Sequence, residues 1–421
     1  MQELATLTYA DPRVMQDPYP YYARLRAEDP VHFDERMRTW LVTRHDDIIA
    51  VARNTAVFSD EMKVSQSVRS PFQAEVEQLM IREGFMVLDP ADSFKTDGEL
   101  HARRRRLVQG AFMGANVTAM EARVAGICRE QAAAFLPRGQ ADLVREYAMP
   151  VPIRVICDAL GLPLDHIDEI SRGADAMVAS IGAGATREQA LQRAEALMTL
   201  HRFARDAIAR RRREPGTDLI SQIVHARSED GSEGLTEREI MSIVTVAIAG
   251  GVDTTRNGIS SACHALATRP DLLARLRRSP EQDKEIARFN EEVLRFYAPV
   301  PQLPRVVTAD TVLRGKAIPK GSLVMLCWAS GNRDAGRFAD PDTFDMDRTN
   351  QNQHLAFGTG VHYCLGALLA RQEMKCAVKA LVNGVESLEL ARSSDQLDLS
   401  DSNVILRGFK SLPVRFQARA A

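Results

Sequence analysis

The chain has 421 residues, 45% of them hydrophobic, and its 54 basic and 56 acidic residues leave a net charge of −2. A chain of this length can bury a large core, and its near-zero charge gives no general argument for binding nucleic acid or an anionic membrane. The N-terminal segment is not a signal peptide, and no apolar run approaches the roughly 20 residues of a membrane helix. We therefore expect a soluble, cytoplasmic protein.

The predicted elements are mostly helices, with a few short strands. Apolar periodicity and end signals predict helices over residues 18–30, 45–54, 186–213, 236–270 and 280–297, and strands over 37–44, within 305–326 and after about 386. Thr236, followed three residues later by Glu239, is a capping-box signal for the start of one long helix. No repeat or low-complexity linker interrupts the chain, so we expect one domain over residues 1–421, mainly α, with small β-sheets.

Six cysteines are spread along the chain, and none forms a C-x-x-C pair, which argues against a zinc or iron–sulfur site. A disulfide framework is not expected in a cytoplasmic chain of this size. Four of the cysteines lie among apolar residues and are expected to be small buried hydrophobes: Cys128, Cys157, Cys263 and Cys327.

Cys364 has different neighbours, because it lies in "FGTGVHYCLG", residues 357–366, just before a helical segment. The free N–H groups at a helix N-terminus favour a thiolate there, and Gly358 allows a tight turn around it. Gly366 lets a flat partner approach, and Phe357 would shield the sulfur from water. These features favour a heme iron held by one thiolate. A structural cysteine, or a nucleophile paired with a histidine, remains open on this stretch alone.

The same stretch resembles the heme-binding signature of the cytochrome P-450 superfamily, in which Phe, Gly, Cys and Gly stand at the spacing of Phe357, Gly360, Cys364 and Gly366. The resemblance implies the cytochrome P-450 fold, a large helical domain with small β-sheets at one side. It also implies that Cys364 is the axial ligand of heme b, iron protoporphyrin IX.

A second element is "EEVLR", in which Glu292 and Arg295 lie three residues apart on one helical face. Taken alone, this spacing is usual for a surface ion pair of little energetic value. In the family, the pair is buried and holds the segment before the heme loop, which "GNRDAGRFADPDTFDMDR" resembles here. The resemblance makes Arg333 and Arg337 candidates for the third member of the network, with Asn332 nearby.

A third element is "AGGVDTT", residues 249–255, in the middle of a long apolar helix. Two adjacent glycines there cost about 1 kcal/mol each relative to alanine, so a kink or a tight helix crossing is one explanation. By resemblance, Gly250 and Gly251 instead make room for dioxygen. Asp253 and Thr254 then deliver the protons that cleave its O–O bond.

A fourth element is "HARRRRLV", residues 101–108. The family pattern implies that His101 and Arg105 face the heme propionates, together with Arg305 and His362. The three remaining arginines, Arg103, Arg104 and Arg106, are then either a solvated stripe or a docking patch for an acidic electron donor. The run of residues 209–213, "ARRRR", is expected to be a solvated helix end.

The substrate pocket is predicted by resemblance, and its lining is largely aliphatic. The predicted lining residues are Phe85, Met86, Leu88, Val246, Ala247, Val300, Leu303, Val404 and Ile405. Gln302 and Asn403 would add a polar contact. The stretch "DPADSFKTDGEL" before His101 departs from the family pattern, which affects the roof of this pocket.

We therefore expect a heme-thiolate monooxygenase that inserts one oxygen atom from dioxygen into an apolar small molecule of the terpenoid, steroid or aromatic class. No flavin or iron–sulfur module is recognisable, so the electrons of NAD(P)H are expected to arrive through a reductase and a separate ferredoxin or flavodoxin. We expect a monomer that binds neither nucleic acid nor membrane. Oxidative coupling or desaturation on the same fold, and a non-catalytic heme sensor, are the alternatives.

Overall fold

The computed structural model describes residues 7–61, 71–179, 185–399 and 405–419, and these divide into two compact units. The first unit comprises Met1–Phe58, Glu121–Pro152 and Thr254–Ala421, and the second comprises Ser59–Met120 and Ile153–Asp253. The helix α11, Glu237–Thr268, contributes to both units. That the chain is one functional domain stays a prediction.

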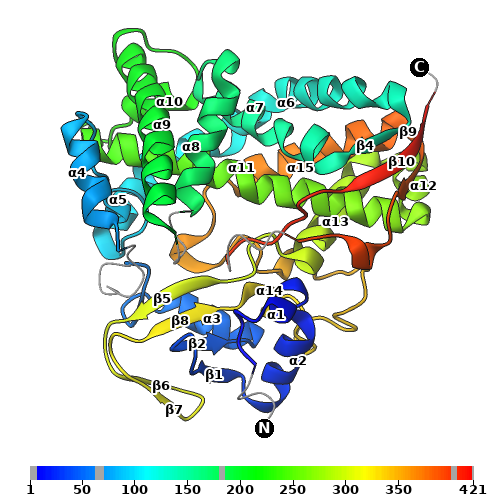
Figure 1. Ribbon diagram of the computed structural model, residues 1–421, viewed down its shortest axis with the longest axis horizontal. Helices are drawn as coiled ribbons and strands as arrows, with labels where there is room; N and C mark the ends of the chain where they lie inside the picture. The colour runs from blue at the N-terminus through cyan, green and yellow to red at the C-terminus, as the bar shows by residue number, and fades with distance from the viewer. Residues whose placement is uncertain (1–6, 62–70, 180–184, 400–404, 420–421) are drawn as a thin grey trace. The chain divides into compact units, whose positions relative to one another are not determined.

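The described strands, labelled in Figure 1, form three sheets, and each sheet contains strands of the first unit. A five-stranded sheet has the order β1-β2-β8-β5-β3, and a three-stranded sheet has the order β4-β10-β9. A two-stranded ribbon is made of β6 and β7. The strands are β1 (Val31–Asp34), β2 (Thr39–Val42), β3 (Phe58–Ser59), β4 (Gln140–Asp142), β5 (Leu303–Val307), β6 (Thr311–Leu313), β7 (Lys316–Ile318), β8 (Leu323–Leu326), β9 (Val385–Leu390) and β10 (Pro413–Ala418).

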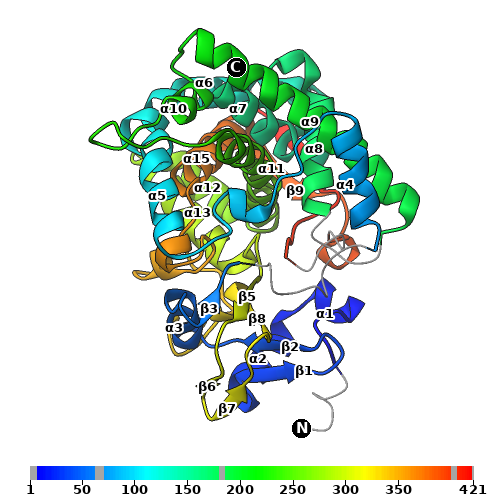
Figure 2. The ribbon, with the colours of Figure 1, turned by 90° about the vertical axis from the view of Figure 1, so that its left-hand side faces the viewer.

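The helices of the first unit pack on these sheets and on one another. Figure 2 shows α12, α13 and α15 side by side, in agreement with the contacts among them. The helices are α1 (Pro12–Gln16), α2 (Tyr19–Glu28), α3 (His45–Arg53), α12 (Pro270–Arg278), α13 (Gln282–Tyr297), α14 (Trp328–Gly331) and α15 (Ala367–Gly384). A buried cluster that includes Ile48, Val324 and Trp328 joins α3 to the five-stranded sheet.

Among its described residues, the second unit has helices, its share of β3 and an isolated β-bridge between Arg227 and Gly234, and α8 packs on α9 within it. Gly173 permits this close approach, since a Cβ at that position would lie 2.5 Å from Cβ of Leu200. Its helices are α4 (Gln73–Arg82), α5 (Gly98–Val108), α6 (Gly114–Phe135), α7 (Pro150–Leu160), α8 (Ile167–Ala179), α9 (Arg187–Arg213) and α10 (Leu219–Val224). Like α11, the helices α6 and α7 contribute residues to both units.

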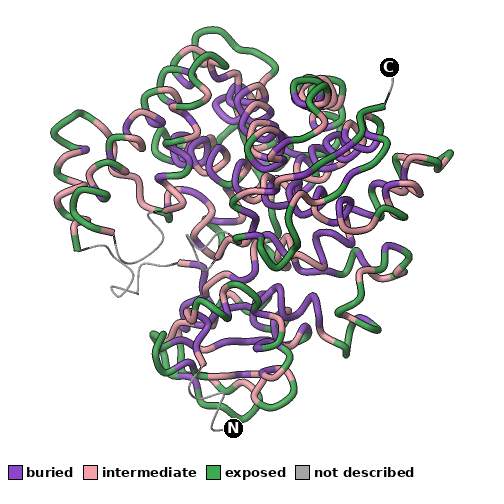
Figure 3. Tube along the Cα trace, turned by 45° about the vertical axis from the view of Figure 1, so that its right-hand side comes forward, coloured by how far each residue is buried: buried purple, intermediate pink, exposed green. Residues whose placement is uncertain are grey.

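The mainly α prediction is confirmed, and the helix ends follow the expected chemistry. Thr236 and Glu239 exchange the two hydrogen bonds of a capping box at the start of α11, with Thr236 N donating to Glu239 Oε2 at 2.8 Å. Arg314 and Gly315 have positive φ in the β6–β7 turn, and Gly321 has positive φ before β8. Figure 3 shows buried stretches running through the helices and sheets.

None of the helices that the structure describes combines the length and the hydropathy that crossing a bilayer requires.

Candidate active site

The segment of residues 331–348 is called the meander below, and the Cys364 loop, residues 357–366, lies between it and α15 within the first unit. Cys364 N donates to Phe357 O at 2.9 Å, which closes the loop, and α15 begins three residues after the thiol, at Ala367. Gly358 and Gly360 have φ of 70° and 74°, a left-handed conformation that glycine adopts without steric cost. The sequence therefore holds Cys364 in a tight turn just ahead of a helix N-terminus.

The surroundings of this loop can accommodate a flat group. A Cβ built at Gly366 meets no atom within 4 Å, so there is open space beside this glycine. A Cβ at Gly360, by contrast, would lie 3.3 Å from Ala52 O, so this glycine allows the loop to pack against the end of α3.

Cys364 is exposed, whereas the other five cysteines, all among the described residues, are buried. Burial raises the pKa of the Cys157 and Cys263 thiols to about 12 and that of Cys376 to about 11, so these groups stay protonated at neutral pH. The predicted burial of Cys128, Cys157, Cys263 and Cys327 is confirmed. Exposure and loop geometry thus distinguish Cys364 as the cysteine that can bind a metal.

Glu292 and Arg295 on α13 form a fully buried ion pair, with both side chains 0% exposed. Arg295 donates through Nε and Nη2 to the two Glu292 oxygens at 2.7 Å each, and through Nη1 to Asn332 O at 2.9 Å. The surface-pair explanation is therefore wrong. Removing one partner would leave a buried charge, which typically costs about 3–5 kcal/mol.

The third member of this network is Arg348. Its Nε lies 3.3 Å from Glu292 Oε1, and its Nη2 donates to the carbonyls of Asp340 and Thr343. The prediction of Arg333 or Arg337 is wrong. The guanidinium of Arg333 is 3.4 Å from the ring centroid of Tyr19, and Arg337 is exposed. Arg348 is the last residue of the meander, and its distance from Glu292 along the sequence did not indicate that the two side chains are in contact.

The middle of α11 has a stripe of increased exposure along one face. Gly250 is exposed, and Val246, Ala247 and Thr254 are half-buried at helical spacing from it. A Cβ at Gly250 meets nothing within 4 Å, whereas a Cβ at Gly251 would contact Ile156 of α7 at 3.6 Å. Open space therefore adjoins Gly250, whereas a side chain at Gly251 would meet Ile156, and the role expected for both glycines in making room for dioxygen stays a prediction.

Asp253 is 6% exposed, and the adjacent Thr254 is half-buried. An acid buried next to an alcohol, one turn beyond Gly250, is an arrangement that can hold and pass protons.

Of the basic residues on α5, His101 is buried and packs edge-on against Phe94, while Arg105, one turn later, is half-buried. Arg104 is buried and donates through Nε to Glu239 at 2.7 Å, and Arg103 pairs with the same carboxylate. Arg103 and Arg104 thus attach α5 to the start of α11. Both predictions for these two arginines, a solvated stripe and a docking patch, are therefore wrong. Arg106 lies at the surface with Glu99 at 2.6 Å.

The two propionate candidates of the first unit differ in burial. Arg305 on β5 is 3% exposed and donates to Pro304 O at 2.8 Å. His362 is half-buried in the Cys364 loop, two residues before the thiol. A buried guanidinium is suited to a carboxylate partner.

The predicted pocket residues are distributed over both units. Phe85 packs under the guanidinium groups of Arg202 and Arg205, and Met86 and Leu88 are half-buried in the same segment. In the first unit, Val300 and Leu303 pack on the cluster around Trp328, and Ile405 packs on the one around Tyr22. Their role in a pocket stays a prediction, and Val404 and Asn403 lie outside the described residues.

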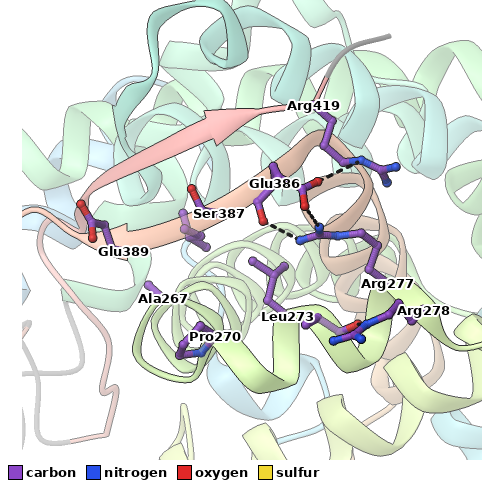
Figure 4. Close-up of a pocket in the computed structure, with 11 residues that line it drawn as sticks. Ala267, Pro270, Leu273, Arg277, Arg278, Glu386, Ser387, Glu389 and Arg419 are labelled. Atoms are coloured by element: carbon purple, nitrogen blue, oxygen red, sulfur yellow. Dashed lines mark hydrogen bonds and ion pairs between the residues drawn. The ribbon is translucent and has the colours of Figure 1, made fainter.

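A surface pocket of about 600 Å³ in the first unit involves none of the predicted site residues (Figure 4). Its floor includes Leu273, and its rim carries Arg277, Arg419 and Glu386. Glu386 already binds both arginines, at 2.8 Å and 3.6 Å, so its carboxylate is engaged and offsets one of their two charges. This pocket has no group suited to the predicted chemistry.

A model of the family described as cytochrome P450 matches residues 186–407. The vitamin D(3) 25-hydroxylase of Pseudonocardia autotrophica is 33% identical, over 96% of this chain and 95% of its own. The 6-deoxyerythronolide B hydroxylase of Saccharopolyspora erythraea is also 33% identical, over 95% and 96%. The structure of cytochrome P450 CYP109Q5 from Chondromyces apiculatus has a TM-score of 0.85 at 27% identity, covering 99% of this chain and 100% of that one. With relatives of this similarity over nearly its whole length, the chain belongs to the cytochrome P450 family.

Proposed function

We propose that Cys364 supplies the thiolate that holds the heme iron, and that the enzyme oxidises an apolar small molecule. Membership of the family makes the chain a heme enzyme and a monooxygenase. The observation that carries the assignment of Cys364 is its position as the exposed cysteine, in a loop closed by glycines before a helix N-terminus. A thiolate is stabilised there by backbone N–H groups.

The remaining cofactor contacts are proposed from charge and space. His101, Arg105, Arg305 and His362 would bind the two propionates, and Phe357, Gly358 and Gly366 would contact the macrocycle. The open space beside Gly366 and the burial of Arg305 fit these roles. When bound, heme with a thiolate ligand would supply the chemistry that takes up two electrons and two protons, inserts one atom of dioxygen into the substrate and releases the other as water.

On α11, Gly250 leaves room for dioxygen, and Asp253 and Thr254 hold and transfer protons. The open space at Gly250 and the burial of Asp253 on the same stretch support this assignment. The Glu292–Arg295 pair acts structurally, because it is fully buried and satisfied by backbone groups of the meander.

The substrate is proposed to be an apolar molecule of the terpenoid, steroid or aromatic class. The half-buried aliphatic side chains of Val246, Val300, Leu303 and Ile405 support this class. One relative is named for vitamin D(3) and another for 6-deoxyerythronolide B. A binding screen followed by the ferric spin-state change would test the class, and charged ligands outranking apolar ones would contradict it.

We propose that electrons come from NAD(P)H through a reductase and a small ferredoxin or flavodoxin, and that the enzyme is a cytoplasmic monomer. Because Arg103 and Arg104 are engaged in internal ion pairs, the donor surface is placed instead beside Cys364. Val361, Tyr363 and Leu368 are exposed there, which favours contact with a partner.

The ligand is tested by Cys364→Ser. The variant should lose the red-shifted Soret band of the ferrous carbon monoxide complex, because a serine oxygen does not donate electron density as a thiolate does. Cys376→Ser, a change to a buried cysteine on α15, is the matched control and should keep the band. A retained band in Cys364→Ser would reassign the ligand.

A further inference from the structure

The Cys364 loop rests on a polar network that none of the roles described above uses. Arg371, in the second turn of α15, places its guanidinium carbon 4.4 Å from the ring centroid of Phe357, within the range of a cation–π contact. Its Nη1 lies 3.1 Å from the Tyr363 hydroxyl. Arg371 thus contacts two residues of the loop. Phe357 accepts the Cys364 N–H through its carbonyl oxygen, and Tyr363 directly precedes Cys364.

Glu291 on α13 holds Arg371 in this position. Arg371 donates to both carboxylate oxygens, from Nε at 2.7 Å and from Nη2 at 2.9 Å, which is the bidentate geometry that fixes a guanidinium plane. Burial alone would raise the pKa of Glu291, but the hydrogen bonds from His354 and Arg371 outweigh it and lower that pKa to about 2. The carboxylate is therefore ionised at neutral pH, and the pair carries no net charge.

His354 is the third side chain of this network, because it binds Glu291 and packs on Phe357. Its Nε2 lies 3.2 Å from Glu291 Oε2, and its Nδ1 accepts from Ala356 N at 3.1 Å. Because Nδ1 accepts a backbone N–H, the proton of the neutral ring is on Nε2 and points at Glu291. The His354 ring also packs on Phe357, with centroids 5.9 Å apart.

Two adjacent carboxylates on α13 thus have different tasks. Glu292 binds Arg295 and Arg348 and holds the meander, whereas Glu291 binds Arg371 and His354, which flank the Cys364 loop. On a helix, consecutive residues point about 100° apart, so one turn of α13 can support two different segments.

We propose that Arg371 is a positioning residue for the thiolate of Cys364, held in place by Glu291 and His354. The inference rests on the proposed role of Cys364 as the heme ligand. By stacking on Phe357 and binding Tyr363, Arg371 restricts the movement of the loop and so fixes the position of the Cys364 sulfur. When this restraint is lost, the loop moves more readily and the sulfur is more easily displaced from its position as ligand.

The chain offers a closely matched control on the same helix. Glu285 on α13 binds Arg275 at 2.8 Å, and its side chain is 17% exposed, against 16% for Glu291. The two carboxylates therefore lie on the same helix and are equally buried, and each binds an arginine, which comes from α12 for Glu285 and from α15 for Glu291. Arg275 binds Glu285 and Asp347, whereas Arg371 contacts the Cys364 loop.

The experiment compares heme-loaded wild type, Glu291→Gln, Arg371→Lys and Glu285→Gln. The ferrous carbon monoxide complex should convert from its red-shifted to its blue-shifted form about tenfold faster in Glu291→Gln and Arg371→Lys than in wild type, since each loses a charge-assisted hydrogen bond. Hydrogen exchange at the Cys364 amide should accelerate in the same two variants, and their heme potentials should shift. Glu285→Gln should match wild type in all three measurements.

Arg371→Lys keeps the positive charge and loses only the planar guanidinium that binds two oxygens at once. This variant can therefore test the inference if Glu291→Gln does not fold. Conversion and exchange rates equal to those of Glu285→Gln would overturn the inference. A failure of the Cys364 assignment itself looks different, because wild type would then lack the red-shifted band, or Cys364→Ser would keep it.

Discussion

The Cys364 loop and the centre of α11 are both rich in glycine, but their backbones differ. In the loop, Gly358 and Gly360 have positive φ, so glycine supplies a conformation that other residues adopt at a cost. In α11, Gly250 and Gly251 continue a regular helix, so glycine there supplies the absence of a side chain. The comparison separates glycines that shape a backbone from glycines that make room for something else.

The largest expected effect concerns the chemistry assigned to α11. Asp253→Asn should lower the rate of product formation about a hundredfold, because the amide cannot relay a proton. The turnover rate under saturating electron donor measures this. Thr255→Val, a change at a buried neighbour outside the proposed proton path, should stay near wild type. An unchanged rate in Asp253→Asn would remove the proton role from this helix.

The next effect tests glycine as a conformational residue. Gly360→Ala should destabilise the protein by about 2 kcal/mol, because its φ of 74° is unfavourable for alanine and the new Cβ would lie 3.3 Å from Ala52 O. The shift of the urea unfolding midpoint gives the size of the loss. A midpoint equal to that of wild type would show that the loop can adopt another backbone.

The third effect should have the opposite sign. Gly250→Ala should stabilise the helix by up to about 1 kcal/mol, since alanine is the better helix former, while it slows carbon monoxide binding to the ferrous heme. Gly251→Ala is the control, because its Cβ would make an ordinary contact with Ile156 at 3.6 Å and leave the ligand side unchanged. Equal carbon monoxide rates in the two variants would contradict the assignment of open space to Gly250.

The smallest effect on stability is expected at Gly366, which sharpens the comparison within the loop itself. Its φ is −84°, so alanine fits the backbone, and the change in unfolding free energy should stay within about 0.5 kcal/mol. The new methyl group would project into the space assigned to the macrocycle, so heme retention during gel filtration should fall. Full retention would place the macrocycle away from this residue.

The sequence alone determined the local features of this protein. Each of these features depends on residues within four positions of one another. They are the capping boxes of α9 and α11, the turn at residues 314–315 and the placement of Glu292 and Arg295 on one face of α13. Helix geometry and glycine torsions settle such relations without the rest of the chain. The cysteine motif of residues 357–366 likewise indicates the family without any tertiary information.

The tertiary structure decided which distant partner each local group meets. Arg348, and not Arg333 or Arg337, completes the Glu292 network, and Arg104 is buried against Glu239, 135 residues away. Glu291 gives no sign in the sequence that its partner is Arg371, 80 residues along the chain. Several arginines are chemically equivalent as partners for a carboxylate, so only the packing of helices and loops, which determines which of them comes within hydrogen-bond distance, selects among them.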